Sequence, residues 1–422
     1  MPTAIMSVVI LSGGLSDKAD YHGLASFTAS LLTKGTLKRT GKDISQQIAA
    51  MGGSLEAQSG LSDLTSVVSA RGFVENLDQT IDILADVLRN PAFPGEEVEN
   101  FKERMLVRLQ TRRSSPDVLA QEQLSRAIYG SHPASLVELP ADSIRKLSPK
   151  DLSDFHSTYY RPNNAILAIA GDITLNEVLP KIEKTFGGWQ RADVPPMTIQ
   201  EAPPQTGARI FLIDRPGSVQ TVLRLGNLGI ERTSPDFPPL LLANRILGGG
   251  AAARLFLNLR EDKGYTYGAY SSFDTPKFRG TWVSRSAVRT EVTAGAMHEF
   301  MYELKRLRNE KVSAGELDDA KRAVIGNLAL SLEGSETLLN NVITQKLYNF
   351  PSDYWDTYPY KIAAVTADDI QRVAQKYIDL DQLQIIAVGD ASKLLGVLAK
   401  YGKVEVSDVD GRPVPPLDMK KN

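Results

Sequence analysis

Hydrophobic residues recur at two kinds of spacing along the chain, and the same succession of spacings occurs twice. Residues 64–70 and 281–287 carry the β-branched and alternating apolar positions that predict strands. Each stretch is followed by apolar residues at intervals of three and four, over 74–88 in the first half and 292–307 in the second. That spacing predicts an amphipathic helix. The pattern therefore predicts a strand-then-helix unit in each half of the chain.

A longer internal repeat supports this interpretation. Residues 147–172 and 365–390 align with each other without gaps. In each copy a hydroxyl residue, Ser148 or Thr366, stands at the N-cap position of a predicted helix. A buried strand follows and ends in a Gly-Asp pair in both copies. We interpret the repeat as an internal duplication.

A proline-rich stretch separates the two halves. Residues 194–205 hold four prolines, which is typical of a linker. The predicted domains are residues 1–192 and 207–422, joined by a linker over 193–206. Each is expected to be an α+β domain in which a mainly antiparallel β-sheet packs with α-helices, and the duplication makes the two domains homologous.

Composition narrows the function classes. The chain has 422 residues and a formal net charge of −2, and its lysines and arginines form no stripe, which argues against nucleic acid as a partner. It contains no cysteine, so disulfides, thiol nucleophiles and cysteine-type zinc sites are excluded. No apolar run approaches the ~18 residues of a membrane span.

One segment suggests a specific family. Residues 23–36 read GLASFTASLLTKGT. This segment resembles the zinc-binding helix of the M16 (pitrilysin, or inverzincin) metallopeptidases, which carries H-x-x-E-H: two His ligands and a Glu that activates water. In the alignment the first His falls on Ser26, the Glu on Ala29 and the second His on Ser30. The resemblance implies a zinc-peptidase frame whose metal-binding residues are replaced.

Further stretches resemble the same family, in the family's order and over nearly the whole chain. They are residues 52–55 (GGSL), 90–93 (NPAF), 129–133 (YGSHP), 160–164 (YRPNN), 247–250 (LGGG), 254–260 (RLFLNLR) and 265–270 (YTYGAY). The resemblance implies a LuxS/MPP-like metallohydrolase fold in which two homologous domains close around a cavity.

The resemblance also implies where a third zinc ligand, a Glu, would lie. In this chain that position falls at or next to Arg108, and a shifted register would reach Glu103. A cation at the site would repel zinc, and one carboxylate without histidine is a weak zinc ligand. We therefore expect no metal and no cofactor in this chain.

The remaining candidates for catalysis are few. The four histidines are far apart in sequence and show no ligand spacing; they are His22, His132, His156 and His298. His156 falls in a helical pattern and is expected to be structural. Ser26 or Ser30 would need a base to act as a nucleophile, with His22 the nearest. We favour small polar side chains that fill the space of the imidazoles, and predict no catalytic residue.

Arg260 and Tyr267 are the predicted substrate-binding residues. In the family, an Arg and a Tyr seven residues apart reach from the C-terminal domain to bound substrate, and these two residues match that spacing. A guanidinium offers a fixed fork of donors, and a phenol can donate to an oxygen that gains charge. We expect Arg260 at a helix end and Tyr267 on the next strand, with Tyr265 and Tyr270 as alternative registers.

The run Gly248-Gly249-Gly250 lacks the lysine and the spacing of a phosphate-binding loop. A turn between helices with close backbone packing explains it better, and a second role lining the peptide cavity stays open.

These features lead to a primary hypothesis and two alternatives. The chain is predicted to be a non-catalytic subunit of a heterodimeric M16 zinc peptidase, whose partner carries H-x-x-E-H and the zinc, and which acts on an unfolded peptide. The alternative is a non-enzymatic scaffold or peptide-binding protein of the same fold. An active peptidase with an unrecognised site is disfavoured by the scattered histidines. A homodimer of the isolated chain is possible, and the resemblance suggests the periplasm.

Overall fold

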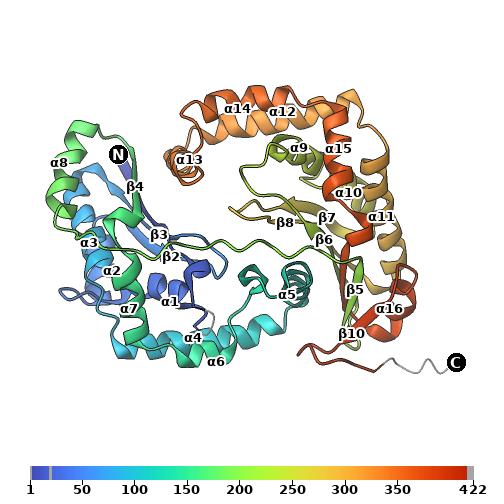
Figure 1. The fold of residues 1–422 in the computed structure, drawn as a ribbon, viewed down its shortest axis with the longest axis horizontal. Coiled ribbons are helices and arrows are strands. Elements are labelled where there is room, and N and C mark those ends of the chain that lie inside the picture. The colour runs from blue at the N-terminus through green and yellow to red at the C-terminus, as the bar shows by residue number, and fades with distance from the viewer. Residues whose placement is uncertain (1, 19–20, 416–422) are drawn as a thin grey trace. The chain divides into compact units, whose positions relative to one another are not determined.

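The computed structural model describes residues 2–18 and 21–415, and its contacts divide the chain into two compact units. The first unit comprises Met1–Gln110, Glu138–Ile199 and Leu330–Ser352, and the second comprises Thr111–Val137, Gln200–Ala329 and Asp353–Asn422. Each unit combines one β-sheet with helices (Figure 1), which confirms the predicted α+β class. Among the described residues, no helix is long and apolar enough to cross a membrane.

The sheet of the first unit has four antiparallel strands in the order β2-β3-β1-β4. They are β1 (Thr3–Ile10), β2 (Ser54–Gln58), β3 (Ser66–Phe73) and β4 (Ala165–Gly171). β1 lies between β3 and β4 and is buried along almost its whole length. The helices of this unit are α1 (Leu24–Leu31), α2 (Gly41–Ala50), α3 (Leu77–Arg89), α6 (Ala141–Lys146), α7 (Pro149–Tyr159), α8 (Leu175–Phe186), α13 (Ser335–Leu347) and most of α4 (Gly95–Arg113).

The sheet of the second unit has six strands in the order β10-β5-β9-β6-β8-β7. They are β5 (Arg209–Asp214), β6 (Gln220–Leu228), β7 (Thr266–Phe273), β8 (Thr281–Arg289), β9 (Gln384–Gly389) and β10 (Val404–Ser407). β10, β5 and β9 run parallel, and the other pairings are antiparallel. The helices are α5 (Pro116–Tyr129), α9 (Phe237–Leu247), α10 (Arg254–Phe256), α11 (Thr293–Asn309), α14 (Tyr354–Ala363), α15 (Ala367–Tyr377), α16 (Ala391–Leu398) and most of α12 (Ala314–Ser331).

The structure confirms the internal duplication. The strand order β7-β8-β6-β9 repeats the order β2-β3-β1-β4, and β5 and β10 are added only in the second sheet. The sequence repeat corresponds to α7 followed by β4 and to α15 followed by β9. Both helices begin with a capping box, Ser148 with Asp151 and Thr366 with Asp369, in which side chain and backbone exchange hydrogen bonds.

Each half of the sequence contributes one helix to the unit that contains the sheet of the other half. These helices are α5, from the first half, and α13, from the second half. In the second unit α5 packs on β6 and β9, where Leu124 lies against Gly226. In the first unit α13 packs on β4 and β1, where Leu339 joins a buried cluster with Ile5 and Ala168. The predicted boundaries of the homologous halves, 1–192 and 207–422, stay a prediction, because these units divide the chain by packing and not by homology.

Candidate functional site

Helix α1 carries the three positions at which the resembling family holds its zinc chemistry. Ala29 is fully buried, whereas Ser26 and Ser30 are partly exposed and lie one turn apart on the same face. Phe27 and Leu31 are fully buried in the core. The helix therefore keeps its packing frame, with a methyl group and two hydroxyl groups at the aligned positions.

Helix α1 begins with a side-chain cap from a distant residue. Gly23 has a φ of 97°, a left-handed conformation that favours glycine. The carboxylate of Asp17 accepts hydrogen bonds from the N–H groups of Gly23 at 2.6 Å and Ala25 at 2.9 Å. Burial raises the pKa of Asp17 to about 7, against the lowering effect of these donors. Sequence spacing does not predict this cap, because Asp17 lies far from the N-cap position.

The loop after α1 is tied to α3 through a buried carboxylate. Thr36 Oγ1 donates to Asp86 at 2.8 Å, and the Arg39 guanidinium donates to Asp86 and to Asp82, each at 2.5 Å. Burial opposes the charge on Asp86, but hydrogen bonds from Asn90, Thr36 and Arg39 outweigh it and hold its pKa below the ordinary value. These contacts give the family-like residue Thr36 a structural role.

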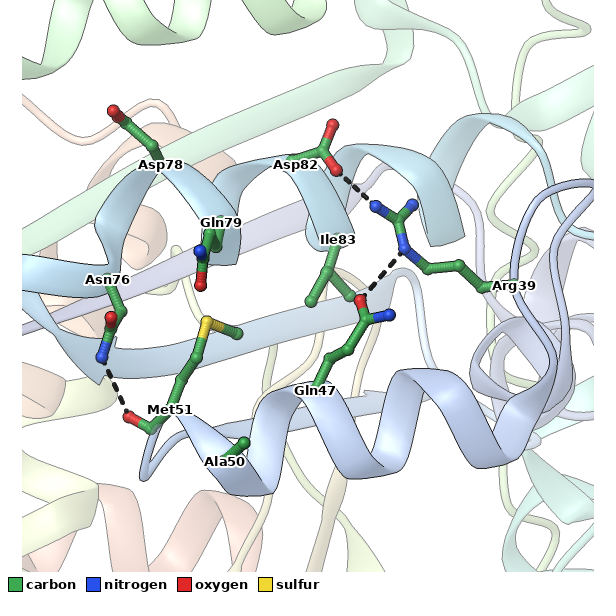
Figure 2. A pocket seen from close by; sticks show the side chains of 9 residues that line it. All are labelled: Arg39, Gln47, Ala50, Met51, Asn76, Asp78, Gln79, Asp82 and Ile83. Atoms are coloured by element: carbon green, nitrogen blue, oxygen red, sulfur yellow. Dashed lines mark hydrogen bonds and ion pairs between the residues drawn. The ribbon is translucent and has the colours of Figure 1, made fainter.

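The same arginine lines an open groove of about 610 Å³ between α2 and α3 (Figure 2). Arg39 Nε also donates to Gln47 at 3.2 Å, and Asn76 donates to the carbonyl of Met51. The lining residues are Arg39, Gln47, Ala50, Met51, Asn76, Asp78, Gln79, Asp82 and Ile83. None of the predicted site residues lines this groove.

Helix α4 holds the predicted third-ligand position. The ring of Phe101 in α4 meets the ring of Phe27 in α1 edge to face, with centroids 4.8 Å apart, so the two helices are neighbours. Arg108 and Glu103 are both exposed. Over residues 2–18 and 21–415, no group of three or more His, Asp or Glu side chains is placed to hold a metal ion.

Two of the histidines have structural roles. His156 lies in α7 and its Nε2 donates to the carbonyl of Leu88 at 2.8 Å, as expected for a structural residue. Burial lowers its pKa to about 4, so the ring is neutral at physiological pH. His132 is buried, and its Nδ1 accepts from the N–H of Ala134 while Nε2 bonds the carbonyl of Gln200.

Arg260 lies in a π-helix, η6 (Leu257–Asp262), which continues α10. Its side chain is 45% exposed, forms an ion pair with Glu261 at 3.2 Å, and places its guanidinium 4.7 Å from the centre of the Phe256 ring. Such a short π-helical turn is rare and often marks a functional site. The sequence predicted a helix end here, but not its π form.

Tyr267 lies near the start of β7, as predicted, at an irregularity in the strand. The pairing of β7 with β8 shifts register between Thr266 and Ala269, which is a β-bulge. Tyr267 is 90% exposed. A bulge at the edge of a sheet re-aims the side chains that it carries.

The surroundings of Tyr267 differ from those of its two alternatives, Tyr265 and Tyr270. The Tyr265 ring lies against Gly295 of α11, where an added Cβ would meet its hydroxyl at 2.7 Å. The Tyr270 ring contacts Phe256, with centroids 5.6 Å apart. Both alternatives therefore have packing roles, whereas Tyr267 has most of its surface in solvent. Since η6 packs against β7, Arg260 and Tyr267 are carried by adjacent elements.

The glycine run after α9 fits the predicted packing turn. The N–H of Ser271 in β7 donates to the carbonyl of Gly248 at 3.0 Å, and an added Cβ on Gly248 would lie 2.3 Å from that nitrogen. Glycine is needed there because the two backbones touch.

Comparison with known proteins identifies the family of the chain. The family model described as Insulinase (Peptidase family M16) matches residues 1–138, and the model described as Peptidase M16 inactive domain matches residues 146–324. The chain is 27% identical to the rat mitochondrial-processing peptidase subunit beta, over 93% of this chain and 81% of that protein. It is 24% identical to the uncharacterized zinc protease YmxG of Bacillus subtilis, over 79% of this chain and 80% of that protein.

Solved structures show the same fold. A peptidase M16 inactive domain from Pseudomonas fluorescens superimposes with a TM-score of 0.84 at 26% identity, over 92% of this chain and 93% of that one. The periplasmic protease PqqL from Escherichia coli superimposes with a TM-score of 0.76 at 13% identity, over 92% of this chain and 43% of that one. The family models together match well over half of the chain, and it therefore belongs to peptidase family M16.

Proposed function

We propose that this chain is a non-catalytic subunit of a heterodimeric zinc metallopeptidase of the M16 family. The observation that carries the proposal is a contrast within the chain. Helix α1 keeps the packing of a zinc-binding helix but presents Ser26, Ala29 and Ser30 at the ligand positions, and none of these three side chains can replace histidine or glutamate. Arg260 and Tyr267, in contrast, are displayed on exposed, irregular elements.

In this proposal the partner supplies the metal and the water-activating Glu in an H-x-x-E-H motif. Zinc polarises a peptide carbonyl and activates water in such sites. This chain supplies the Arg260 guanidinium, which would bind a carbonyl or carboxylate of the substrate, and the Tyr267 hydroxyl, which would donate to the carbonyl oxygen as it gains charge. The name of the rat relative, a subunit of a processing peptidase, supports a divided enzyme.

The proposed substrate is an unfolded peptide bound in an extended conformation. β7 is an edge strand of its sheet and carries Tyr267, and β2 is an edge strand of the other sheet. Edge strands offer unpaired N–H and carbonyl groups, to which an extended peptide can add. The periplasm is the proposed location, on the similarity to a protease named as periplasmic.

Cleavage of a quenched fluorogenic peptide library tests the proposal, with the chain alone and mixed with an H-x-x-E-H homologue encoded beside it. Zinc is measured in each sample. We expect neither bound zinc nor cleavage for the chain alone, and cleavage in the mixture well above that of the homologue alone. Zinc and activity in the isolated chain would contradict the proposal. If the mixture gains nothing, the chain is better described as a scaffold or peptide-binding protein.

A further inference from the structure

The elements that carry Arg260 and Tyr267 both depart from regular backbone geometry. In η6 the N–H of Lys263 donates to the carbonyl of Asn258, five residues earlier, at 3.0 Å. In β7 the bulge leaves Tyr267 between the two paired residues Thr266 and Ala269. Irregular backbone persists only where the surrounding structure fixes it. Side chains of neighbouring elements are therefore expected to hold these two segments in their irregular conformations.

The side-chain amide of Asn258 connects η6 to α11. Asn258 Nδ2 donates to Glu299 Oε2 at 3.0 Å and to Glu303 Oε1 at 2.9 Å, so that both amide protons are used. Glu303 is 3% exposed, and Glu299 and Glu303 stand one helical turn apart. Lys263 and Arg306 lie 3.7 Å and 3.6 Å from these carboxylates, which offsets their charge. The η6 backbone is thus pinned two residues before Arg260.

At the bulge, where the regular pairing of β7 with β8 is interrupted, the hydroxyl groups of Thr266 and Ser286 form hydrogen bonds between the two strands. Thr266 Oγ1 donates to the carbonyl of Ala287 at 2.7 Å and accepts from the N–H of Gly268 at 3.1 Å. Ser286 Oγ lies 2.9 Å from the carbonyl of Gly268 and 3.0 Å from Thr266 Oγ1. Ser286 is 7% exposed, so this contact is shielded from water. The residues on both sides of Tyr267 are therefore held to β8.

We propose that Asn258 and Ser286 are positioning residues, which fix the backbone that presents Arg260 and Tyr267 to a peptide. Neither side chain contacts the substrate in this account. Loss of Asn258 leaves two carboxylates without their common donor, and loss of Ser286 removes one hydrogen bond from the Gly268 carbonyl and one from the Thr266 hydroxyl. The inference rests on the proposed function of the Arg–Tyr pair.

The test compares Asn258→Leu and Ser286→Ala with matched controls. Ser284→Ala removes a fully buried serine two residues away on β8, whose hydroxyl makes no hydrogen bond. Asn327→Leu changes an exposed asparagine on α12. Each variant is mixed with the H-x-x-E-H homologue to measure kcat and KM, and its thermal unfolding is recorded. The isolated chain is also labelled with fluorotyrosine, and the Tyr267 resonance is assigned by its loss in Tyr267→Phe.

We expect kcat/KM to fall about 10- to 100-fold in Asn258→Leu and Ser286→Ala, because small displacements of positioned groups have effects of that size. The Tyr267 resonance should shift in Ser286→Ala and not in Ser284→Ala. Activity unchanged in both positioning variants, with Arg260→Ala and Tyr267→Phe impaired, would overturn this inference alone. Activity unchanged in Arg260→Ala and Tyr267→Phe would overturn the proposed function. The two positioning variants are independent, so if one fails to fold the other still decides.

Discussion

Asp236 illustrates at the residue scale how one buried carboxylate joins two helices. It precedes α9 and accepts hydrogen bonds from Arg372 at 2.7 Å, Lys376 at 2.9 Å and the Tyr377 hydroxyl at 2.6 Å, all on α15. Burial opposes its charge, but these donors outweigh that effect and lower its pKa to about 2. The ionised form is therefore the one that stabilises the fold.

Asp236→Asn should lower the free energy of unfolding at pH 7 by roughly 1 to 2 kcal/mol, a range reduced for the exposed partners Arg372 and Lys376. The charge contributes above the ordinary pKa of 3.8 and its contribution is lost as the pH falls toward about 2. Urea unfolding at pH 7 and pH 2.5 measures this. A variant that is equally destabilised at both pH values would contradict the electrostatic account.

His156 stabilises the fold in its neutral form, whereas Asp236 does so in its charged form. Both contributions to stability should be lost as the pH falls. Its pKa in the folded protein is about 4, below the ordinary 6.5, so the neutral ring stabilises the fold above pH 6.5 and that contribution is lost as the pH falls through 6.5 toward 4. The full effect is about 3 kcal/mol at most. His156→Gln keeps a donor for the Leu88 carbonyl but does not titrate. The free energy of unfolding of the wild type and of His156→Gln is measured between pH 7 and pH 4. A difference between the two proteins that does not change with pH would refute this prediction.

At the element scale, regular features were predictable from sequence and irregular ones were not. The repeat with Ser148 and Thr366 predicted two capped helices because capping depends on neighbouring residues. From the sequence, Tyr267 was expected on a strand and Arg260 at a helix end, within the stretch that resembles the M16 family. The π-helix and the bulge depend instead on side chains distant in sequence, such as Glu303 for Asn258 and Ser286 for Thr266. No local pattern shows such contacts.

Two glycine substitutions should have opposite effects on stability. Gly248→Ala places a Cβ 2.3 Å from the Ser271 backbone nitrogen, so it should destabilise the protein by about 2 kcal/mol or more. Gly326 lies within α12 with nothing near an added Cβ, so Gly326→Ala should stabilise by about 0.5 to 1 kcal/mol. Chemical unfolding of both variants tests this. A neutral Gly248→Ala would show that the α9–β7 contact yields easily.

At the scale of the whole molecule, the exchanged helices explain why the two halves should stay together. α5 from the first half packs on β6 and β9, and α13 from the second half packs on β4 and β1. The apolar residues at these contacts include Leu124 and Leu339. The duplication could be predicted from the sequence because residues 365–390 repeat the pattern of residues 147–172. The packing of α5 and α13 on the sheet of the other half could not be predicted, because the sequence of an amphipathic helix does not specify which of two similar sheets it covers.

A cut in the linker should therefore not separate the halves. A protease recognition site inserted between Thr198 and Ile199, in an exposed stretch without regular structure, allows the cut to be made in the folded protein. The two fragments should co-elute in size-exclusion chromatography in native buffer and separate in 6 M guanidinium chloride, roughly the concentration that unfolds even hyperstable domains. Fragments that separate in native buffer would contradict the exchanged packing.

In the proposed heterodimer, Arg260 of this chain binds substrate at a zinc site on the other chain. The most direct measurement is kcat/KM for peptide cleavage by the mixture with the H-x-x-E-H homologue, comparing the wild-type chain, Arg260→Ala and the control Arg322→Ala, an exposed arginine on α12. We predict a loss of about 10- to 100-fold for Arg260→Ala, because a hydrogen bond from a charged group to the substrate contributes roughly 1.5 to 3 kcal/mol, and wild-type activity for the control. Equal activity in all three would contradict the account.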